Sequence, residues 1–484
     1  MRSCSRPTSR ASMAAAATLG ALSVMSAPAQ AAAPSARPNV VVIVADDLGY
    51  NDLSSYGSKY PTPNIDRLAK DGVRFTQGYV TAALCSPSRA GMLTGRYQQR
   101  FGHEYQLYTP LNNRRDGIDP GQPTLARSLH DAGYRTALYG KWHLGMAPER
   151  HPLKMGFDEF FGVSGGQTPY IAADRPDVVS SPPADQAPGQ YQRNESSSFQ
   201  EAGQPVDLQD YATTAFTDHA LSFIDKNKDR PFFLMMTYTA PHVPLQATKA
   251  QLAKLAAIED PEMRLYRTVI NELDIGVGQI RERLAKNGLT DNTIVVFISD
   301  NGCPDYVKQV CSNDPLNAWK RYLTEGGVRV PYMMSWPAKV KGGRTYDGVV
   351  SSLDIFPTVA AAAGAKGDDR QPTDGRDLLP YLQGKAKGAP HDRLYWRSLP
   401  SYAIRDGDWK LIVNASPKGE TVTMLFDLAK DRAEKHDLAP QNPEIVARLN
   451  REWKAWSDTL AAPRWPTARE FDVEINGVPV RTTN

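Results

Sequence analysis

The pentapeptide Cys85-Ser86-Pro87-Ser88-Arg89 carries the residue types of a nucleophilic site. A cysteine phosphatase loop needs an arginine six positions after its cysteine, so that backbone amides surround a phosphate, but position 91 is glycine. Residues 87–93 instead predict the first turns of a helix, because proline is tolerated there. The amides at the start of that helix, together with Arg89, favour negative charge beside Cys85. The alternative is a buried structural cysteine.

A second group of residues offers oxygen ligands. Asp46-Asp47 and Asp300-Asn301-Gly302 each follow an apolar, β-branched run. Three carboxylates brought together repel one another unless a cation neutralises them. An all-oxygen ligand set suits Ca²⁺, or less well Mg²⁺, and not zinc. The alternatives are capping or turn residues at Asp46-Asp47 and a tight turn at Asp300-Asn301-Gly302.

Basic groups form a third set. Lys141 and His143 flank Trp142 at the end of another apolar run, and alternation along a strand places both on one side. His242 lies between two prolines, and Lys320 precedes a Gly-rich stretch. Cations and hydrogen-bond donors of this kind stabilise an oxyanion. The alternatives are histidines satisfied in the core or at the surface, and a solvated lysine.

The elements that must position these residues follow from hydrophobic periodicity. Four apolar runs that end in the polar clusters predict buried parallel strands at 39–45, 134–139, 232–239 and 294–299. Periodic segments with start and stop signals predict helices at 63–71, 125–132 and 261–287. This alternation predicts an α/β fold with a large, mostly parallel sheet flanked by helices. Such sheets bind ligands beyond the carboxyl ends of their strands, where all four clusters lie.

The remaining chain divides into a loop region and a second domain. Residues 165–210 are rich in Pro, Ser, Asp and Gln and predict a long surface excursion near the site. After Gly384, short strands are predicted at 394–397, 402–405, 409–413 and 424–427, followed by a helix at 443–460. We therefore expect a catalytic domain at 32–384 and a smaller α+β domain with an antiparallel sheet at 385–484.

Residues 1–31 have the organisation of a secretory signal peptide. Three arginines precede an apolar run at 13–25, which is followed by Ala29-Gln30-Ala31. The three arginines account for the formal net charge of +3, so the remaining chain is neutral and has no general attraction for nucleic acid or anionic membranes. No later stretch is long enough to span a membrane, and no lipid anchor is expected. We expect an exported bacterial protein, periplasmic or secreted; a disordered tail is the alternative.

The cysteine count fits an exported chain with one reactive thiol. Cys4 leaves with the signal peptide, and Cys85, Cys303 and Cys311 remain. Cys303 and Cys311 are spaced to close a small loop in an oxidising compartment, with two free thiols as the alternative. Cys85 is then the unpaired cysteine.

Together these motifs resemble the type I, formylglycine-dependent sulfatases of the alkaline phosphatase superfamily. The resemblance extends from the first strand to the chain end. It is carried by Asp46-Asp47, the segment 85–95 (CSPSRAGMLTG), 140–143, His242, Asp300-Asn301-Gly302, Glu325-Gly326-Gly327 and 425–439.

The resemblance implies roles for the candidate site residues. Cys85 would be oxidised to formylglycine by a formylglycine-generating enzyme, and its hydrated aldehyde would attack sulfur. The implied Ca²⁺ ligands are Asp46, Asp47, residue 85, Asp300 and Asn301. Arg89 and Lys141 would hold the hydrated aldehyde, His143 would help the hemiacetal collapse, and His242 and Lys320 would contact the sulfate and leaving oxygen. A family serine after the Lys-Trp-His segment does not align: Ser164 is nearby, but the register points to Gly166.

The implied activity is hydrolysis of sulfate esters, with sulfated carbohydrates as the expected substrates and a small aryl sulfate as an alternative. His103 and Glu104 are candidates to hydrogen-bond sugar hydroxyls, and packing within a loop is the alternative for both. Two rival functions stay open from sequence. One is a phosphodiesterase or phosphonate hydrolase of the same superfamily, and the other is a non-catalytic binder of sulfated glycans with an unconverted Cys85.

Overall fold

The structure is a computed structural model that describes residues 5, 7–8, 37–108, 115–172, 174–181 and 193–483. The chain divides into two compact units, Met1–Pro34 and Ser35–Asn484. Almost all of the predicted signal peptide, 1–31, lies outside the described residues. The second unit contains every candidate site residue and is described below.

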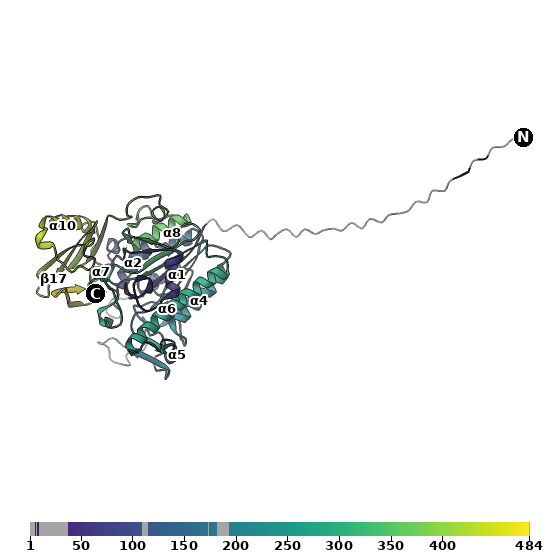
Figure 1. Cartoon of the computed structure of the whole chain (residues 1–484), viewed down its shortest axis with the longest axis horizontal. Helices are drawn as coiled ribbons and strands as arrows, with labels where there is room; N and C mark the ends of the chain where they lie inside the picture. The colour runs from purple at the N-terminus through teal and green to yellow at the C-terminus, as the bar shows by residue number, and fades with distance from the viewer. Residues whose placement is uncertain are drawn as a thin grey trace. The chain divides into compact units, whose positions relative to one another are not determined.

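A ten-stranded sheet forms the centre of this unit (Figure 1). Strand β1 (Asn39–Ala45) lies between β11 (Thr293–Ser299) and β9 (Phe232–Thr237) and runs parallel to both. Strand β4 (Arg135–Lys141) continues the parallel arrangement on the far side of β9. The four predicted parallel strands are therefore confirmed, and they are immediate neighbours.

Further strands make the sheet mixed. The strand order is β13-β2-β12-β11-β1-β9-β4-β5-β7-β8. The strands not yet placed are β2 (Val73–Phe75), β5 (Glu159–Val163), β7 (Phe199–Glu201), β8 (Gln204–Val206), β12 (Tyr332–Ser335) and β13 (Arg344–Tyr346). Of these, β12 runs antiparallel to β11 and β7 antiparallel to β5, whereas β5 is parallel to β4.

Both faces of the sheet are covered by helices. Val40, Val42 and Val44 point into one hydrophobic cluster, and the alternate residues of β1 point into the other. The first cluster includes side chains of α2 (Cys85–Thr94), α3 (Leu125–Asp131) and α8 (Ile355–Ala363). The second includes side chains of α1 (Pro63–Asp71), α4 (Ala212–Asn227) and α6 (Pro261–Lys286). Because both faces are buried, β1 is an unbroken apolar run.

The long helix α6 was predictable because its start carries two helix-initiating residues. The Asp260 side chain accepts a hydrogen bond from the Met263 amide, and Pro261 occupies the first turn, where its missing N–H costs nothing. Helix α4 was not predicted. Its preceding residue, Tyr211, makes no side-chain capping bond, and no glycine follows its last turn.

The C-terminal region forms a separate antiparallel sheet of six strands. Its strands are β15 (Arg393–Ser398), β16 (Ser401–Asp406), β17 (Trp409–Ala415), β18 (Thr421–Asp427), β19 (Glu470–Ile475) and β20 (Val478–Thr483). Helix α10 (Pro443–Ser457) packs on β16 and β17. The four predicted strands and the helix are confirmed, whereas the β19–β20 hairpin was not predicted. Residues 35–484 cluster as one compact unit, so a boundary at residue 384 stays a prediction.

The predicted excursion at 165–210 contains regular structure where it is described. Strand β6 (Val178–Ser181) pairs with β10 (Leu245–Thr248), and β7 and β8 extend the main sheet. The remaining short elements are β3 (Gly78–Tyr79), β14 (Val350–Ser351), α5 (Lys249–Ala253), α7 (Glu325–Val328) and α9 (Leu379–Leu382).

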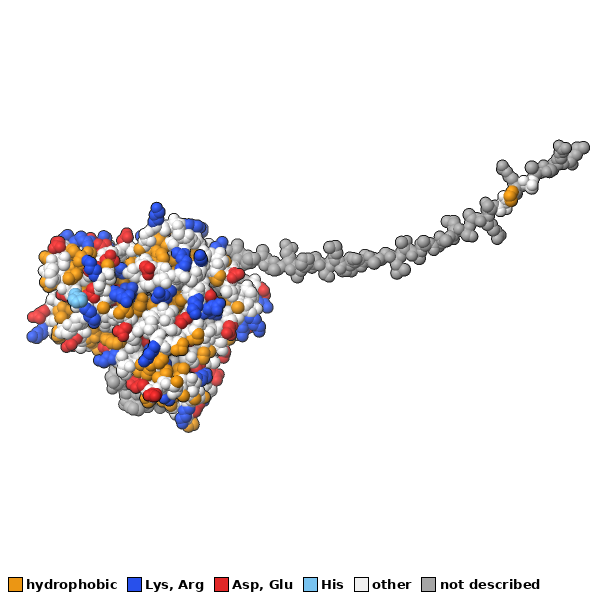
Figure 2. Space-filling view, viewed as in Figure 1, with side chains coloured by type: hydrophobic (Ala, Val, Ile, Leu, Met, Phe, Trp, Pro, Cys, Tyr) orange, Lys and Arg blue, Asp and Glu red, His pale blue; other side chains and the backbone are white. Residues whose placement is uncertain are grey.

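Two features bear on where such a chain can act. Within the described ranges, no helix combines the length and the apolar character needed to cross a bilayer. Side chains of both charges are interspersed over the face seen in Figure 2, in keeping with the low net charge.

Candidate active site

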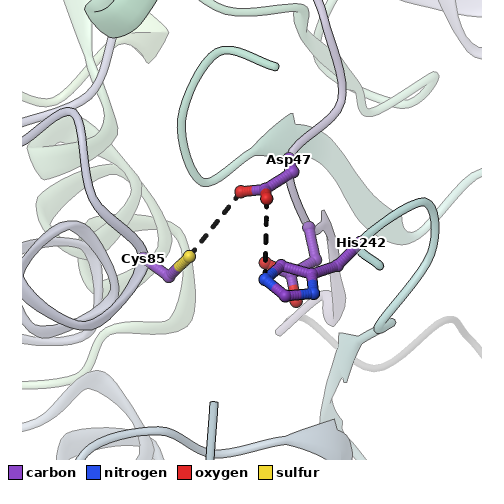
Figure 3. Close-up of side chains that lie close together, drawn as sticks. Asp47, Cys85 and His242 are labelled. Atoms are coloured by element: carbon purple, nitrogen blue, oxygen red, sulfur yellow. Dashed lines mark hydrogen bonds and ion pairs between the residues drawn. The ribbon is translucent and has the colours of Figure 1, made fainter. Parts of the chain in front are cut away.

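The candidate residues converge at the carboxyl ends of four adjacent strands. Asp46 and Asp47 follow β1, Lys141 ends β4, and Asp300 follows β11. Since β11, β1, β9 and β4 are consecutive in the sheet, their polar ends meet at one edge. Figure 3 shows Cys85, Asp47 and His242 pointing toward one another across this edge.

Cys85 is the first residue of α2 and is fully buried. Its Sγ lies 3.1 Å from the Lys320 Nζ and 3.7 Å from the Asp47 Oδ1. Burial, reinforced by the nearby Asp300 carboxylate, raises the pKa of the Cys85 thiol to about 12. The thiolate is therefore disfavoured at neutral pH, and the site is not built to activate a cysteine as such.

Each of the three carboxylates is paired with a cation. The Lys141 Nζ lies 2.7 and 2.9 Å from the two Asp46 oxygens, and the Lys320 Nζ lies 2.7 and 2.9 Å from those of Asp47. The Arg89 Nε lies 2.8 Å from the Asp300 Oδ2. The predicted mutual repulsion of the carboxylates is thus already balanced by three basic side chains.

These pairs set the ionisation of the site. Burial opposes the charge of Asp46, but Lys141, His242 and Arg89 outweigh it and hold its pKa well below the usual range. For Asp300, burial outweighs the attraction of Arg89 and raises the pKa to about 6. Lys320 is also buried, yet its contact with Asp47 keeps its pKa well above the usual value, so it stays a cation.

The residues fit a hard divalent cation. Ligand atoms of Asp46, Asp47, Cys85 and His242 lie within 4.8 Å of one another. The Asn301 Nδ2 donates to the Asp47 Oδ1 at 2.7 Å, while the buried Asn301 Oδ1 has no hydrogen-bond partner among the residues that the structure describes. Buried amide oxygens usually have a partner, and a Ca²⁺ or Mg²⁺ ion would supply one to this oxygen beside the carboxylates.

The two histidines have defined tautomers. The His143 Nε2 donates to the Leu107 carbonyl at 2.8 Å, which leaves a buried Nδ1 that can accept a proton and has no hydrogen-bond partner within the described ranges. Burial and Lys141 lower the pKa of His143 well below its usual value, so it is neutral. The His242 Nδ1 donates to the Val243 carbonyl at 2.6 Å, and its Nε2 faces the Asp47 Oδ2 at 3.6 Å.

The backbone at the site is strained in two places. Asp47 and His143 have φ values of 66° and 58°, in the left-handed region that residues other than glycine rarely adopt. Strain of this kind persists where surrounding contacts fix the conformation, and it concentrates at functional sites.

The segment after β4 places Ser164 and Gly166 beside His143. The His143 amide donates to the Ser164 carbonyl at 3.2 Å, so Ser164 contributes its backbone here. A Cβ added at Gly166 would lie 2.7 Å from the His143 ring. A side chain at position 166 would therefore require the imidazole to shift.

His103 and Glu104 lie beside the site but are turned into the protein. A His103 ring nitrogen lies 2.6 Å from the Ser86 Oγ, and the Glu104 carboxylate pairs with Arg397 at 2.6 Å. Both side chains are buried, and among the described residues the His103 Nδ1 has no hydrogen-bond partner. Their contacts are those of packing within a loop, and a role in binding a sugar stays a prediction.

One contact residue was missed at the sequence level. The Tyr306 Oη donates to the Asp47 Oδ2 at 3.3 Å, from a loop closed by the Cys303–Cys311 disulfide. The disulfide confirms the cysteine pairing that the spacing favoured. The Cys303–Cys311 loop directly follows Asp300 and Asn301 in the chain, and this proximity was the signal that could have identified Tyr306.

Comparisons with known proteins agree with this geometry. The family described as sulfatase matches residues 38–365, and the family described as N-sulphoglucosamine sulphohydrolase, C-terminal, matches residues 318–458. The chain is 34% identical to N-acetylgalactosamine-6-sulfatase of Canis lupus familiaris, over 77% of this chain and 71% of that protein. It is 33% identical to arylsulfatase A of Homo sapiens, over 86% of each.

A solved structure extends the likeness to three dimensions. The crystal structure of Ps i-CgsB in complex with k-i-k-neocarrahexaose superposes with a TM-score of 0.78 at 36% identity, over 89% of this chain and 94% of that chain. The large mixed sheet and the C-terminal antiparallel sheet agree with this likeness. This chain belongs to the sulfatases of the alkaline phosphatase superfamily and is a sulfuric ester hydrolase.

Proposed function

We propose that this chain hydrolyses sulfate esters of carbohydrates with a formylglycine made from Cys85. The observation that carries the proposal is the placement of the buried Cys85 at the start of α2, against Asp47 and Lys320. A thiol whose pKa is about 12 is a poor nucleophile, whereas a hydrated aldehyde supplies one hydroxyl to attack sulfur and a second to expel sulfate.

The carbohydrate part of the proposal rests on the relatives. One is named for sulfated N-acetylgalactosamine, and the Ps i-CgsB structure contains a neocarrahexaose. Aryl sulfates are the smaller alternative, because arylsulfatase A is comparably similar.

A divalent cation fits the electrostatics of the proposed reaction. Since three carboxylates face three basic side chains, a bound divalent ion makes the site net positive, which favours a sulfate ester. The ligands would be Asp46, Asp47, residue 85, Asp300 and Asn301, and the many oxygens favour Ca²⁺ over Mg²⁺. When bound, such an ion would supply Lewis-acid polarisation of the sulfate oxygens.

The protein side chains divide the remaining work. Arg89 and Lys141 lie on the Asp46 side and would orient residue 85, and the Nδ1 of His143 would accept its proton. Lys320 and His242 lie on the Asp47 side and would stabilise the leaving oxygen.

Export and maturation belong to the same proposal. The Cys303–Cys311 disulfide is of a kind that persists in an oxidising compartment, which supports a periplasmic or secreted protein. Conversion of Cys85 would require a formylglycine-generating enzyme during biosynthesis.

The test combines a mass measurement with a substitution. In a host with a formylglycine-generating enzyme, the tryptic peptide 75–89 should lose sulfur and two hydrogens and gain one oxygen at Cys85. Cys85→Ala should lower release of sulfate from 4-nitrophenyl sulfate by at least about a thousandfold, as loss of a nucleophile does. An unmodified thiol in an active enzyme, or retained turnover by Cys85→Ala, would contradict the proposal. Faster cleavage of 4-nitrophenyl phosphate diesters than of the sulfate would favour the phosphodiesterase alternative.

A further inference from the structure

Tyr306 is the most exposed of the side chains that contact Asp47. Among the described residues, Asn301 and Cys85 are fully buried, and Lys320 and His242 are only 6% and 8% exposed. Tyr306 is half-buried: its hydroxyl contacts Asp47, its side chain packs at the margin of a hydrophobic cluster, and part of it is accessible to solvent. Of the side chains on Asp47, Tyr306 is therefore the one most accessible to a substrate.

The ring stands on one identifiable side of the site. The Tyr306 Oη, the His242 Nε2 and the Lys320 Nζ lie 3.3, 3.6 and 2.9 Å from the same atom, the Asp47 Oδ2. Lys141, by contrast, contacts the Asp46 carboxylate. Tyr306 is thus grouped with the two residues that face the leaving oxygen in the proposed function.

Three restraints fix the position of the ring. The Cys303–Cys311 disulfide closes its loop, and the Lys320 amide donates to the Cys303 carbonyl at 2.9 Å. The Arg321 guanidinium pairs with Asp305 at 2.6 Å and lies 5.8 Å from the Tyr306 ring centre. On its other side Arg321 lies 4.2 Å from the ring centre of Phe471 in β19. The disulfide-closed loop and Arg321 together hold the Tyr306 ring in one position, so the ring is preorganised to contact a ligand.

We propose that Tyr306 is a specificity-determining residue whose ring packs against the leaving group of the substrate, the sugar unit in the proposed function on which this inference rests. An aromatic face offers a large apolar surface at low entropic cost, which suits the C–H face of a sugar. The hydroxyl contributes by anchoring the ring to Asp47. The contribution to binding therefore resides in the ring rather than in the hydroxyl.

The first test measures binding without turnover. Cys85→Ala protein is titrated calorimetrically with N-acetylgalactosamine 6-sulfate, alone and combined with Tyr306→Ala or Tyr306→Phe. We expect Tyr306→Ala to weaken binding about three- to tenfold, in the range of one aromatic contact, and Tyr306→Phe to weaken it less than about twofold. The control is Tyr60→Ala, which removes another half-buried ring that lies beside an arginine, Arg267, at 4.5 Å.

The second test separates binding from chemistry in the mature enzyme. Tyr306→Ala should raise KM for N-acetylgalactosamine 6-sulfate while leaving kcat within about threefold, because uniform binding is lost. Equal affinity with and without the ring, no measurable binding to any variant, or equal losses in Tyr306→Phe and Tyr306→Ala would each overturn the inference. A ring-dependent affinity in a protein that releases sulfate from no ester would overturn the proposed function alone.

Discussion

Asp47 shows how one side chain links the parts of this site. Its carboxylate accepts from Lys320, Asn301 and Tyr306, which come from segments that follow β11 in the chain. Its amide donates to the Asp300 Oδ1 at 3.1 Å. The positive φ of Asp47 is what turns its amide and its carboxylate toward these partners. Any cation bound here competes with Lys320 for the Asp47 oxygens, so its affinity depends on the remaining carboxylates.

Asp300 gives a prediction at the residue scale. Asp300→Asn keeps the acceptor for the Asp47 amide but removes one of three carboxylates that balance three basic groups. We expect the affinity for Ca²⁺ to fall at least about tenfold because of the lost charge attraction, with the rate falling in parallel. Calorimetric titration of the chelated protein with Ca²⁺ measures the first effect, and sulfate release measures the second.

A matched substitution controls for general damage. Asp305→Asn also removes a carboxylate paired with an arginine, Arg321, but outside the ligand set. It should leave Ca²⁺ affinity within about twofold, as expected for a charge screened by solvent. Full activity of the native enzyme after chelation, or equal affinity in Asp300→Asn, would count against a cation at this site.

At the scale of elements, β4 must approach β9 closely for Lys141 to reach Asp46. Gly140 pairs with Thr237 of β9, has a φ of 124°, and would place an added Cβ 1.9 Å from the Thr237 carbonyl oxygen. No side chain fits there without moving one strand. The glycine before Lys141 is therefore part of the geometry that delivers the lysine.

Gly140→Ala tests this close approach. We expect it to destabilise the fold by about 3 kcal/mol or more, the range for a steric clash with backbone at a special φ. Gly133→Ala is the matched control, because Gly133 precedes the same strand with a φ of 85° but has open space around it. That variant should lose only about 1 kcal/mol. Urea unfolding measures both, and equal losses would show that φ alone accounts for the effect.

The elements also show what sequence could and could not predict. The strands β1, β4, β9 and β11 were predictable because burial on both faces makes each an apolar run with a polar end. Strands β7 and β8 were not, because they are short and partly exposed and carry no such run. The β19–β20 hairpin did carry a signal, the Asn476-Gly477 turn with φ values of 51° and 78°, which is the strongest short-range indication of a hairpin.

The site residues divide in the same way: those at strand ends were predictable, and those on loops were not. Residues at strand ends, such as Asp46 and Lys141, were predictable because the sheet fixes where they go. Tyr306 and the Leu107 carbonyl were not, because loop conformation decides their positions. The burial of His103 and Glu104 was not predictable either, because sequence spacing does not tell which way a loop side chain points.

At the scale of the whole molecule, a buried charge cluster joins α7 to the C-terminal sheet. Glu325 of α7 lies 2.8 Å from the Lys410 Nζ of β17, and the same nitrogen lies 3.0 Å from Glu434. The Glu325 amide donates to Glu434 at 2.7 Å, and the Glu325 carboxylate accepts from Tyr79. Glu325 lies five residues after Lys320 in the chain, so the cluster fixes the segment that carries this site lysine.

The cluster predicts a pH dependence of stability. Burial, reinforced by Glu325 and opposed by Lys410, raises the pKa of Glu434 to about 7. For Glu325, Lys410 and Arg329 outweigh burial and lower the pKa to about 2. Between the ordinary glutamate pKa and about 7, the unfolded chain has lost the Glu434 proton while the folded protein keeps it. Stability contributed by Glu434 therefore falls as pH rises through that interval, by about 3 kcal/mol.

Glu434→Gln isolates this contribution, because the amide resembles the protonated acid and cannot ionise. The free energy of unfolding of the variant should match that of the native chain near pH 5 and exceed it by about 3 kcal/mol at pH 8, since only the native side chain pays for deprotonation in the interior. Glu444→Gln, an exposed position on α10, should show no such divergence. A constant difference between Glu434→Gln and the native chain from pH 5 to 8 would mean that Glu434 is ionised throughout, with Lys410 shared by two carboxylates.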